Sequence, residues 1–495
     1  MIKKTIKIKY SLLLFITVFF TNSCGDEFIN VDAFDENSED FFNSQADYDA
    51  ALIGAYDLLQ STYLNVMLGE IASDNTLAGG ESATDVPGIQ EVDDMTHTPL
   101  NEDLRNIWSW MFAGVNRANY ILEFKDKTDF GGKEAIIAEA TFLRAYYYFE
   151  LVKWFGDVPL AVDKRFLFGD QDVVERTPKA EVYAQIEIDL QFAAANLPYV
   201  QTETGRVTKG AAQALLGKAY LFQNKFTEAA VVLDDLIANG PYDLITDYST
   251  MFENDNENNI ESVFEVQYID VEGAGFSCLQ CSEGNVAVGF NGIRNYTGPL
   301  FDSGFSFNVP TQKVVDAFEV GDGRKDVAIL DISAWANQNS GVSFVEGYEH
   351  TGYYNRKYIA RKGDSNIGDA NLTNPNNYRA IRFADVLLMA AEANNRKPSS
   401  DDTKARGYIN RVRNRAFGDL NHQISLSGAA LTDAIAIERQ LELVGEGHRF
   451  FDLVRTGRAA QEIPGFATGK NEVFPIPSIE IELAGNRWSQ NPGYN

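Results

Sequence analysis

The residues of this sequence best suited to chemistry are Glu446, His448 and Asp452, two carboxylates and one imidazole placed close together. Such groups carry general acid–base catalysis when they face a cleft. Here they alternate with arginines and bulky apolar residues in IERQLELVGEGHRFFDLVRTGR. That mixture is typical of ion pairs that fasten a helix corner to a core. We therefore predict no catalytic residue and assign pairing and packing roles to four residues: Arg439, Glu442, Arg449 and Asp452.

The same stretch predicts two helices. Apolar residues at helical spacing continue to about Val444, and Gly445 and Gly447 then break the pattern. A second, short helix follows and carries Phe450 and Phe451.

Other patterns that would indicate an enzyme are missing from the sequence. The four histidines are far apart and none lies in HExxH, which argues against a helical zinc site. There is no GxSxG motif, and the glycines at 131–132 lack the spacing of a P-loop. The run at 255–259 has the acids but not the glycine of a calcium loop. We expect neither a metal nor a cofactor.

Aromatic residues on loops indicate a different chemistry, the binding of sugars. The apolar faces of sugar rings stack on aromatic rings, while amide, carboxylate and guanidinium groups hold the hydroxyls. The alternative for each residue is a small separate core beneath a long loop. The candidates are Asp74, Asn75, Phe290, Arg294, Tyr296, Trp335 and Tyr348.

The first residues predict export. Four lysines precede an apolar run at 10–20, and Ser23 and Cys24 follow. The run is too short to span a bilayer, so we interpret 1–23 as a cleaved signal peptide. Cys24 is then the expected lipid anchor, with a plain signal peptide as the alternative.

Removing 1–23 takes away four lysines and no acids, so the net charge goes from −29 to −33. Such a charge argues against nucleic acid and favours a neutral ligand.

Cys278 and Cys281 are the other cysteines of the chain. In an exported protein, a Cys-x-x-Cys pair flanked by Gly and Ser predicts a local disulfide that fixes a loop. Free thiols are the alternative.

Helical hairpins form the expected scaffold. In AAQALLGKAYLFQNKFTEAAVVLDDLIANGP, Gly217, Tyr220 and Leu233 fall at the offsets of a tetratricopeptide repeat, and a weaker copy lies at 387–412. The long Gly-rich and polar stretch at 69–101 is expected to be a binding loop.

We divide the chain into a signal peptide (1–23), an acidic tether (24–46), a helical part (47–242), a loop-rich ligand-binding region (243–377) and a helical part that packs back on the scaffold (378–495).

Several blocks in one order carry a resemblance to a known family. They include the tether that Cys24 begins, EATFLRAYYYFELVKWFGDVPL, the repeat at 211–240, NVPTQKVVDAFEVGDGR, IRFADVLLMAAEA and FPIPSIEI. Together they make the chain similar to the SusD/RagB family, the surface glycan-binding lipoproteins of Bacteroidetes. The resemblance covers essentially the whole mature chain.

The resemblance implies a mainly α fold, a tetratricopeptide-like scaffold that carries a loop-rich ligand region. It also implies a non-enzymatic lipoprotein on the surface of the outer membrane. Such a protein captures oligosaccharides and delivers them to a SusC-like TonB-dependent transporter. The alternatives are a peptide-binding member of the family, a helical glycan-degrading enzyme, or a purely structural scaffold. The family's ligand loops offer no motif to match, so the resemblance implies no contact residues.

Overall fold

The computed structural model describes residues 41–167, 174–271, 273, 275–363 and 371–494. The predicted signal peptide, Cys24 and most of the tether lie outside these residues. Helices dominate, and the described strands form two-stranded pairs, as expected for a mainly α protein. None of the described helices is both long and apolar enough to cross a membrane.

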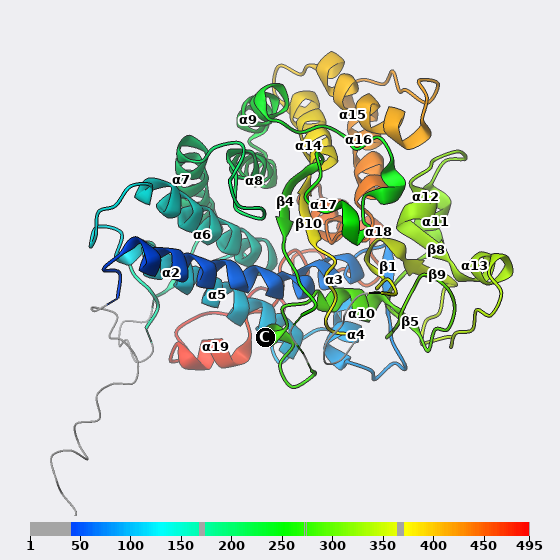
Figure 1. Ribbon diagram of the computed structural model, residues 1–495, viewed down its shortest axis with the longest axis horizontal. Helices are drawn as coiled ribbons and strands as arrows, with labels where there is room; N and C mark the ends of the chain where they lie inside the picture. The colour runs from blue at the N-terminus through cyan, green and yellow to red at the C-terminus, as the bar shows by residue number, and fades with distance from the viewer. Residues whose placement is uncertain (1–40, 168–173, 272, 274, 364–370, 495) are drawn as a thin grey trace, which may run out of the picture.

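The scaffold is a row of helices in which each packs on the next (Figure 1). It runs from α5 (Glu102–Glu123) through α6 (Lys133–Phe155), α7 (Lys179–Asn196), α8 (Lys209–Phe222) and α9 (Phe226–Asn239) to α14 (Phe383–Arg396). Both α15 (Asp402–Phe417) and α16 (Gly428–Leu443) pack on α14, and α2 (Gln45–Asp57) covers α5 and α6. The row is a stack of helical hairpins, which confirms the predicted tetratricopeptide-like architecture.

Small residues allow the close packing of this row. A Cβ atom on Gly217 of α8 would lie 2.4 Å from Leu233 Cδ2 of α9, so a larger residue there would force Leu233 to move. Gly114 of α5 has the same role against the ring of Tyr147 on α6, at 2.6 Å. Tyr220 reaches the preceding helix, where its hydroxyl accepts a hydrogen bond of 3.0 Å from Gln191 of α7. The repeat motif in the sequence therefore corresponds to a real hairpin and its neighbour.

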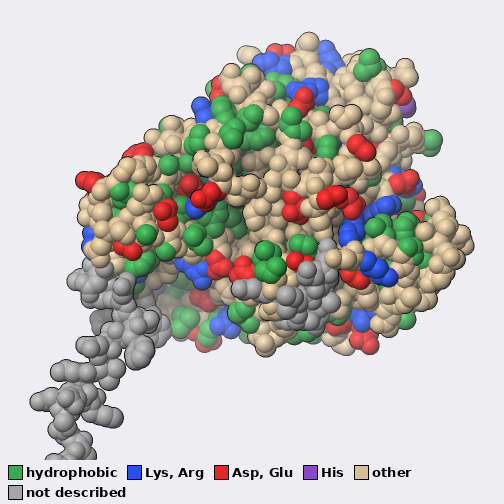
Figure 2. Space-filling view, in the orientation of Figure 1, with side chains coloured by type: hydrophobic (Ala, Val, Ile, Leu, Met, Phe, Trp, Pro, Cys, Tyr) green, Lys and Arg blue, Asp and Glu red, His purple; other side chains and the backbone are tan. Residues whose placement is uncertain are grey.

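The loop-rich region lies at one end of the row, on the right in Figure 1. Its elements are short: α10 (Val286–Asn291), α11 (Gln312–Ala317), α12 (Lys325–Ala328), α13 (Ile332–Gln338), β5 (Ile293–Arg294), β6 (Ser303–Gly304), β8 (Ile329–Asp331) and β9 (Tyr353–Asn355). Figure 2 shows acidic side chains spread over one face of the molecule, with a group of Lys and Arg toward this end. The division at residues 242 and 377 stays a prediction, because one large core runs through helices of both halves.

Two strand pairs join distant parts of the chain. β1 (Thr76–Gly79) pairs with β7 (Phe307–Pro310), and β4 (Ser262–Val266) pairs with β10 (Tyr378–Arg382), both antiparallel. β2 (Val158–Pro159) pairs with β3 (Arg176–Thr177). The sequence predicted β4 but not its partner, because β10 is buried on both faces and has no alternation of polar and apolar residues.

The remaining helices close the site region. They are α3 (Tyr63–Ile71), which the short 3₁₀ helix Leu58–Thr62 joins to α2, α4 (Pro87–Asp93), α17 (Arg449–Arg455), α18 (Ala459–Glu462) and α19 (Ser478–Leu483). The break between α16 and α17 at Gly445 and Gly447 is the predicted one, and both glycines have positive φ. β1 and α4 lie within the stretch expected to be loop. α4 begins at Pro87. The side chains of Ile89 and Val92 form its apolar side and are buried.

Candidate functional site

The acidic residues that could have been catalytic are held in a buried ion network. Glu446 accepts hydrogen bonds from Lys357 Nζ at 2.6 Å and from two nitrogens of Arg382 at 2.7 and 2.9 Å. Glu442 accepts from Arg382 at 2.8 Å, Arg415 at 2.6 Å and Arg324 at 3.0 Å. All of these side chains are nearly or fully buried. Their carboxylate oxygens are occupied by cations and are closed to a substrate.

The protonation states also fit a structural role. Burial alone would raise the pKa of Glu442, but Arg415, Arg382 and Arg324 outweigh it and hold the pKa well below the usual range. Burial and the neighbouring Lys218 lower the pKa of His448 to about 3, so the imidazole is neutral at pH 7. The cavity beside His448 and Asp452 has a volume of about 40 Å³, which holds water but not a sugar.

The predicted pairing roles in this stretch are confirmed. Arg439 binds Asp385 at 2.7 Å and Asp452 at 3.0 Å. Arg449 makes two hydrogen bonds to Asp74, of 2.7 and 3.0 Å. No group of three or more His, Cys, Asp and Glu side chains in the described residues is arranged to hold a metal ion.

A cleft of about 650 Å³ lies elsewhere, between the first helices and the loop-rich region. This volume is in the range of sites for small molecules. Parts of α3, α4, α5 and α10 contribute to the cleft, together with the loop before α4 and the segment 276–280. Its lining residues are Tyr63, Leu64, Met67, Glu81, Asp85, Val86, Ile89, Asp103, Asn106, Trp110, Phe276, Ser277, Cys278, Leu279, Gln280, Phe290, Arg294, Phe305 and Phe307.

One wall of the cleft is a single face of α5. Asp103, Asn106 and Trp110 follow one another at helical spacing, so their side chains share that face. Asn101 fixes the start of the helix, because its side chain accepts a hydrogen bond of 3.0 Å from the amide of Leu104. The neighbouring face of α5 is buried in the core, which leaves this polar and aromatic face for the cleft. The Trp110 ring lies 6.1 Å from that of Tyr63.

Phenylalanine rings make another part of the cleft lining. Phe290 is nearly buried, at 5% exposure, and contacts Phe305 and Phe307 with ring centroids 5.8 and 5.4 Å apart. Phe276 leans on Phe305 at 5.6 Å, and its side chain is 58% exposed. The cleft therefore offers a row of aromatic rings that ends in an exposed one.

Carboxylates outnumber cations among the lining residues. Arg294 donates to the carbonyl of Phe305 at 2.9 Å and to Asp85 at 3.3 Å, and Glu81 lies 3.6 Å from it. Asp103 and Asn106 have no hydrogen-bond partner among the described residues. Burial, together with Glu102 and Glu91, raises the pKa of Asp103 to about 6. At pH 7 and above, the cleft therefore holds a negative carboxylate and an amide that are both available to a ligand.

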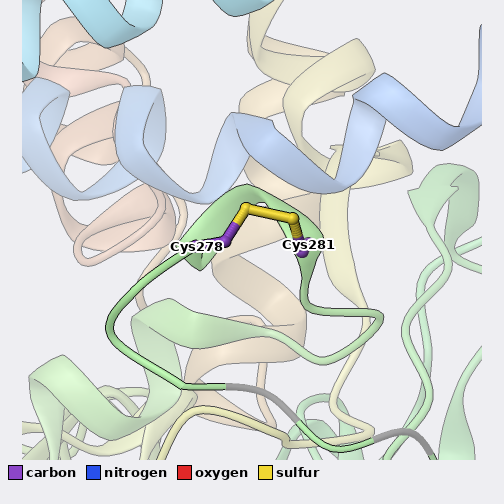
Figure 3. Close-up of a disulfide and its surroundings, with 2 residues drawn as sticks. All are labelled: Cys278 and Cys281. Atoms are coloured by element: carbon purple, nitrogen blue, oxygen red, sulfur yellow. A yellow bond between two sulfur atoms is a disulfide. The ribbon is translucent and has the colours of Figure 1, made fainter. Parts of the chain in front are cut away.

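The two cysteines of the loop-rich region are joined by a disulfide (Figure 3), and one of them, Cys278, lines the cleft. Their Cα atoms are 5.3 Å apart, and the bond closes a tight turn alongside the N-terminal helices. Cys278, Leu279 and the exposed Phe276 all belong to the cleft lining.

The structure brings two of the residues that we predicted for the ligand site into the cleft, Phe290 and Arg294. Asp74 and Asn75 lie outside its lining and are buried. Asp74 pairs with Arg449 and Lys313, and Asn75 bonds to Glu70 and Gln440 at 2.8 Å each. Their side chains fasten the end of α3 to α16, α17 and α11.

Tyr296 and Trp335 also lie outside the cleft lining, as does the partly exposed Tyr348. Trp335 Nε1 donates to the Tyr296 hydroxyl at 2.9 Å, and both rings pack on Phe301. This small core is separate from the main one and includes Ile293, Leu330 and Tyr354. For Tyr296 and Trp335, the alternative stated for the aromatic residues on loops therefore holds: they belong to a small separate core beneath a long loop.

Sequence reasoning missed Asp103, Asn106 and Trp110. They lie on a helix, whereas the predicted ligand residues lie on stretches expected to be loops. The missed signal is on α5 itself, where a large aromatic and two polar residues share one face beside the apolar stripe. Phe276 was also missed, although it lies two residues before Cys278.

Two family models match the chain. One, described as the SusD family, matches residues 331–474. The other, described as starch-binding and associating with the outer membrane, matches residues 27–221. A relative in Formosa agariphila, the SusD-like protein P2, is 27% identical over 492 residues, which cover 92% of this chain and 94% of the relative.

Solved structures share the fold over nearly the whole length. A laminarin-binding SusD-like protein is 35% identical with a TM-score of 0.82, and the match covers 92% of this chain and 100% of that protein. The surface glycan-binding protein A of Bacteroides thetaiotaomicron, solved in complex with laminarihexaose, is 26% identical with a TM-score of 0.80. That match covers 90% of this chain and 99% of that protein. The extent of these matches and the helical scaffold agree, and the chain belongs to the SusD family.

Proposed function

We propose that the protein captures neutral oligosaccharides in the cleft between α5 and the loop-rich region. One observation carries the proposal: a cleft of about 650 Å³ is lined both by Trp110, Asp103 and Asn106 of α5 and by the phenylalanine row. Aromatic rings would stack on the apolar faces of sugar rings, and the carboxylate and amide would hold the hydroxyls. The laminarin and laminarihexaose ligands of related proteins support this class of ligand.

The charges of the cleft favour a neutral glycan over an anionic one. Glu81, Asp85 and Asp103 line it, and Arg294 is the cation among the lining residues. Arg294 is already engaged by Asp85 and by the carbonyl of Phe305. A uronate or sulfate would therefore meet carboxylates without a free guanidinium to bind.

A binding protein fits the acidic groups of the chain better than an enzyme does. The carboxylates near the C-terminal arginines are neutralised in a buried network and are closed to a substrate. Asp103→Asn tests the enzyme alternative, because Asp103 lines the cleft whereas Glu446 is buried. Release of reducing sugar from a polysaccharide, lost in this variant, would establish hydrolysis.

The cellular part of the proposal follows from the sequence and the family. We infer export by residues 1–23, attachment through lipidated Cys24 to the outer membrane, and delivery of the glycan to a SusC-like TonB-dependent transporter. The family description that includes association with the outer membrane supports the location. Replacement of Cys24 by Ala should move the protein out of the membrane fraction. A Cys24→Ala protein that stays there would contradict the anchor.

Calorimetric titration of the 25–495 chain tests the binding function. The panel contains neutral hexasaccharides of the laminarin, starch and fructan types, an oligoalginate as the anionic member, and a set of short peptides. We expect one or more neutral sugars to bind and the oligoalginate to bind at least tenfold more weakly. Binding of peptides alone would replace the proposal with a peptide-binding function.

A further inference from the structure

We infer that the Cys278–Cys281 disulfide is a positioning element of the cleft, because it fixes the turn that holds Phe276 against Phe305. This inference rests on the proposed function and adds how one wall of the site is kept in place. Both the disulfide turn and Phe276 belong to the cleft lining. Figure 3 shows the bond at the top of a loop that projects from the loop-rich region toward the N-terminal helices.

The base of this loop is well anchored. The Ile269 amide donates to the carbonyl of Glu283 at 2.8 Å, and the Gln60 side chain bonds to the carbonyls of Gln267 and Glu283. Ser282 donates its hydroxyl to the carbonyl of Leu372 at 2.9 Å. The two ends of the loop are therefore fixed to neighbouring segments.

The tip of the loop is held differently. In the described segment 275–281, the hydrogen bonds are local and long: Cys278 N–H to Gly275 at 3.2 Å and Cys281 N–H to Cys278 at 3.2 Å. The Phe276 ring contacts Phe305, but more than half of its surface is exposed. Beyond these weak contacts and the partly buried Leu279, the covalent bond is what restricts the turn.

Preorganisation is the physical reason for an effect on affinity. A ligand that stacks on a free aromatic side chain must order the ring and its loop, and each ordered side chain weakens binding. The disulfide removes freedom from the turn 278–281 and so shortens the free stretch of chain between Phe276 and the anchored Ser282. We expect the oxidised protein to bind its glycan about 3- to 10-fold more tightly than the reduced protein.

The chain makes a clean test possible. It has three cysteines, and the 25–495 chain lacks Cys24, so a phosphine reductant acts on one bond. Cys281 is exposed and accessible to the reagent. Reduction adds two electrons and two protons to the disulfide to give two thiols, while the phosphine is oxidised to its oxide with oxygen from water.

The experiment compares the oxidised chain, the same chain in TCEP, and the Cys278→Ser/Cys281→Ser variant. The probe is the neutral hexasaccharide that binds in the panel above, with laminarihexaose first. We expect reduction and the double variant to weaken binding equally, 3- to 10-fold, with TCEP having no effect on the variant. In Phe276→Ala, reduction should change the Kd less than twofold, because the ring that the disulfide positions is gone.

Hydrogen exchange gives a readout that does not depend on the ligand. Amides of 275–283 should exchange faster after reduction, while α6 and α8 stay protected and the melting temperature stays nearly unchanged. Equal Kd values in both redox states, or unchanged exchange of 275–283, would overturn the inference. The same loss on reduction in Phe276→Ala would also overturn it. An oxidised chain that binds no glycan while its loop loosens on reduction would refute the proposed function instead.

Discussion

Replacing Arg449 by alanine tests whether Asp74, an acid that the sequence made a ligand candidate, has a structural role. Arg449 holds Asp74 through two hydrogen bonds of 2.7 and 3.0 Å. The Asp74 side chain is 1% exposed and that of Arg449 is 11% exposed. Burial alone would raise the pKa of Asp74, but Arg449 and Lys313 outweigh it and hold the pKa below the usual range. The pair joins the end of α3 to α17.

The size of the expected loss follows from what the alanine leaves behind. Removing one partner of a buried ion pair destabilises a protein by about 3–5 kcal/mol, because the other charge stays buried and unpaired. Lys313 remains 2.8 Å from Asp74, but its side chain is half exposed. This second cation screens part of the loss, so we expect Arg449→Ala to lower the free energy of unfolding by about 2–4 kcal/mol.

Urea denaturation of the 25–495 chain measures the effect, with Arg458→Ala as the matched control. Arg458 pairs with Asp433, whose side chain is 65% exposed, and we expect its removal to change stability by about 0–1 kcal/mol. The glycan affinity of folded Arg449→Ala should equal that of the unchanged chain. A loss of stability no larger than in Arg458→Ala would refute the reasoning, and so would a selective loss of affinity.

Three further predictions concern the scaffold, acid stability and specificity. Gly217→Ala should destabilise the chain by about 1–3 kcal/mol in urea, since its Cβ would meet Leu233, whereas Gly407→Ala, which has open space around it, should not. Asp74 and other ion-paired carboxylates have depressed pKa values, so their stabilisation is present above about pH 4 and is lost as the pH falls further. Thermal melts should therefore show a fall in stability from pH 5 to pH 3, and a flat profile would contradict this. Asp103→Asn should raise the affinity for oligoalginate several-fold at pH 8 and little at pH 5, because the pKa of Asp103 is about 6. Equal effects at both pH values would contradict the assignment.

Much of the fold could be predicted from the sequence because its signals are local. The offsets of Gly217, Tyr220 and Leu233 describe a hairpin in which a Cβ atom at position 217 would meet Leu233. Gly445 and Gly447 mark the end of α16 because their positive φ stops any helix there. The strand β10 was not predicted, because a strand that is buried on both faces lacks a regular alternation of polar and apolar residues.

The site was harder to predict because it depends on contacts between distant residues. Phe290 and Arg294 were found since they lie in a stretch rich in Gly and aromatics. Trp110 was missed because the face of α5 that stays free is decided by how α5 packs on α6. Asp74 resembled a ligand residue because its partner, Arg449, is 375 residues away in the chain.

The most direct test of the binding cleft compares two tryptophans. Trp110 lines the cleft, whereas Trp335 packs on Phe301 and donates to Tyr296 in the separate small core. In calorimetric titrations with laminarihexaose or the neutral hexasaccharide that binds best, we expect Trp110→Ala to weaken binding about 5- to 100-fold, the loss of a stacked ring. Trp335→Ala should change the Kd less than twofold. Loss of binding in Trp335→Ala with binding retained in Trp110→Ala would contradict the assignment of the cleft.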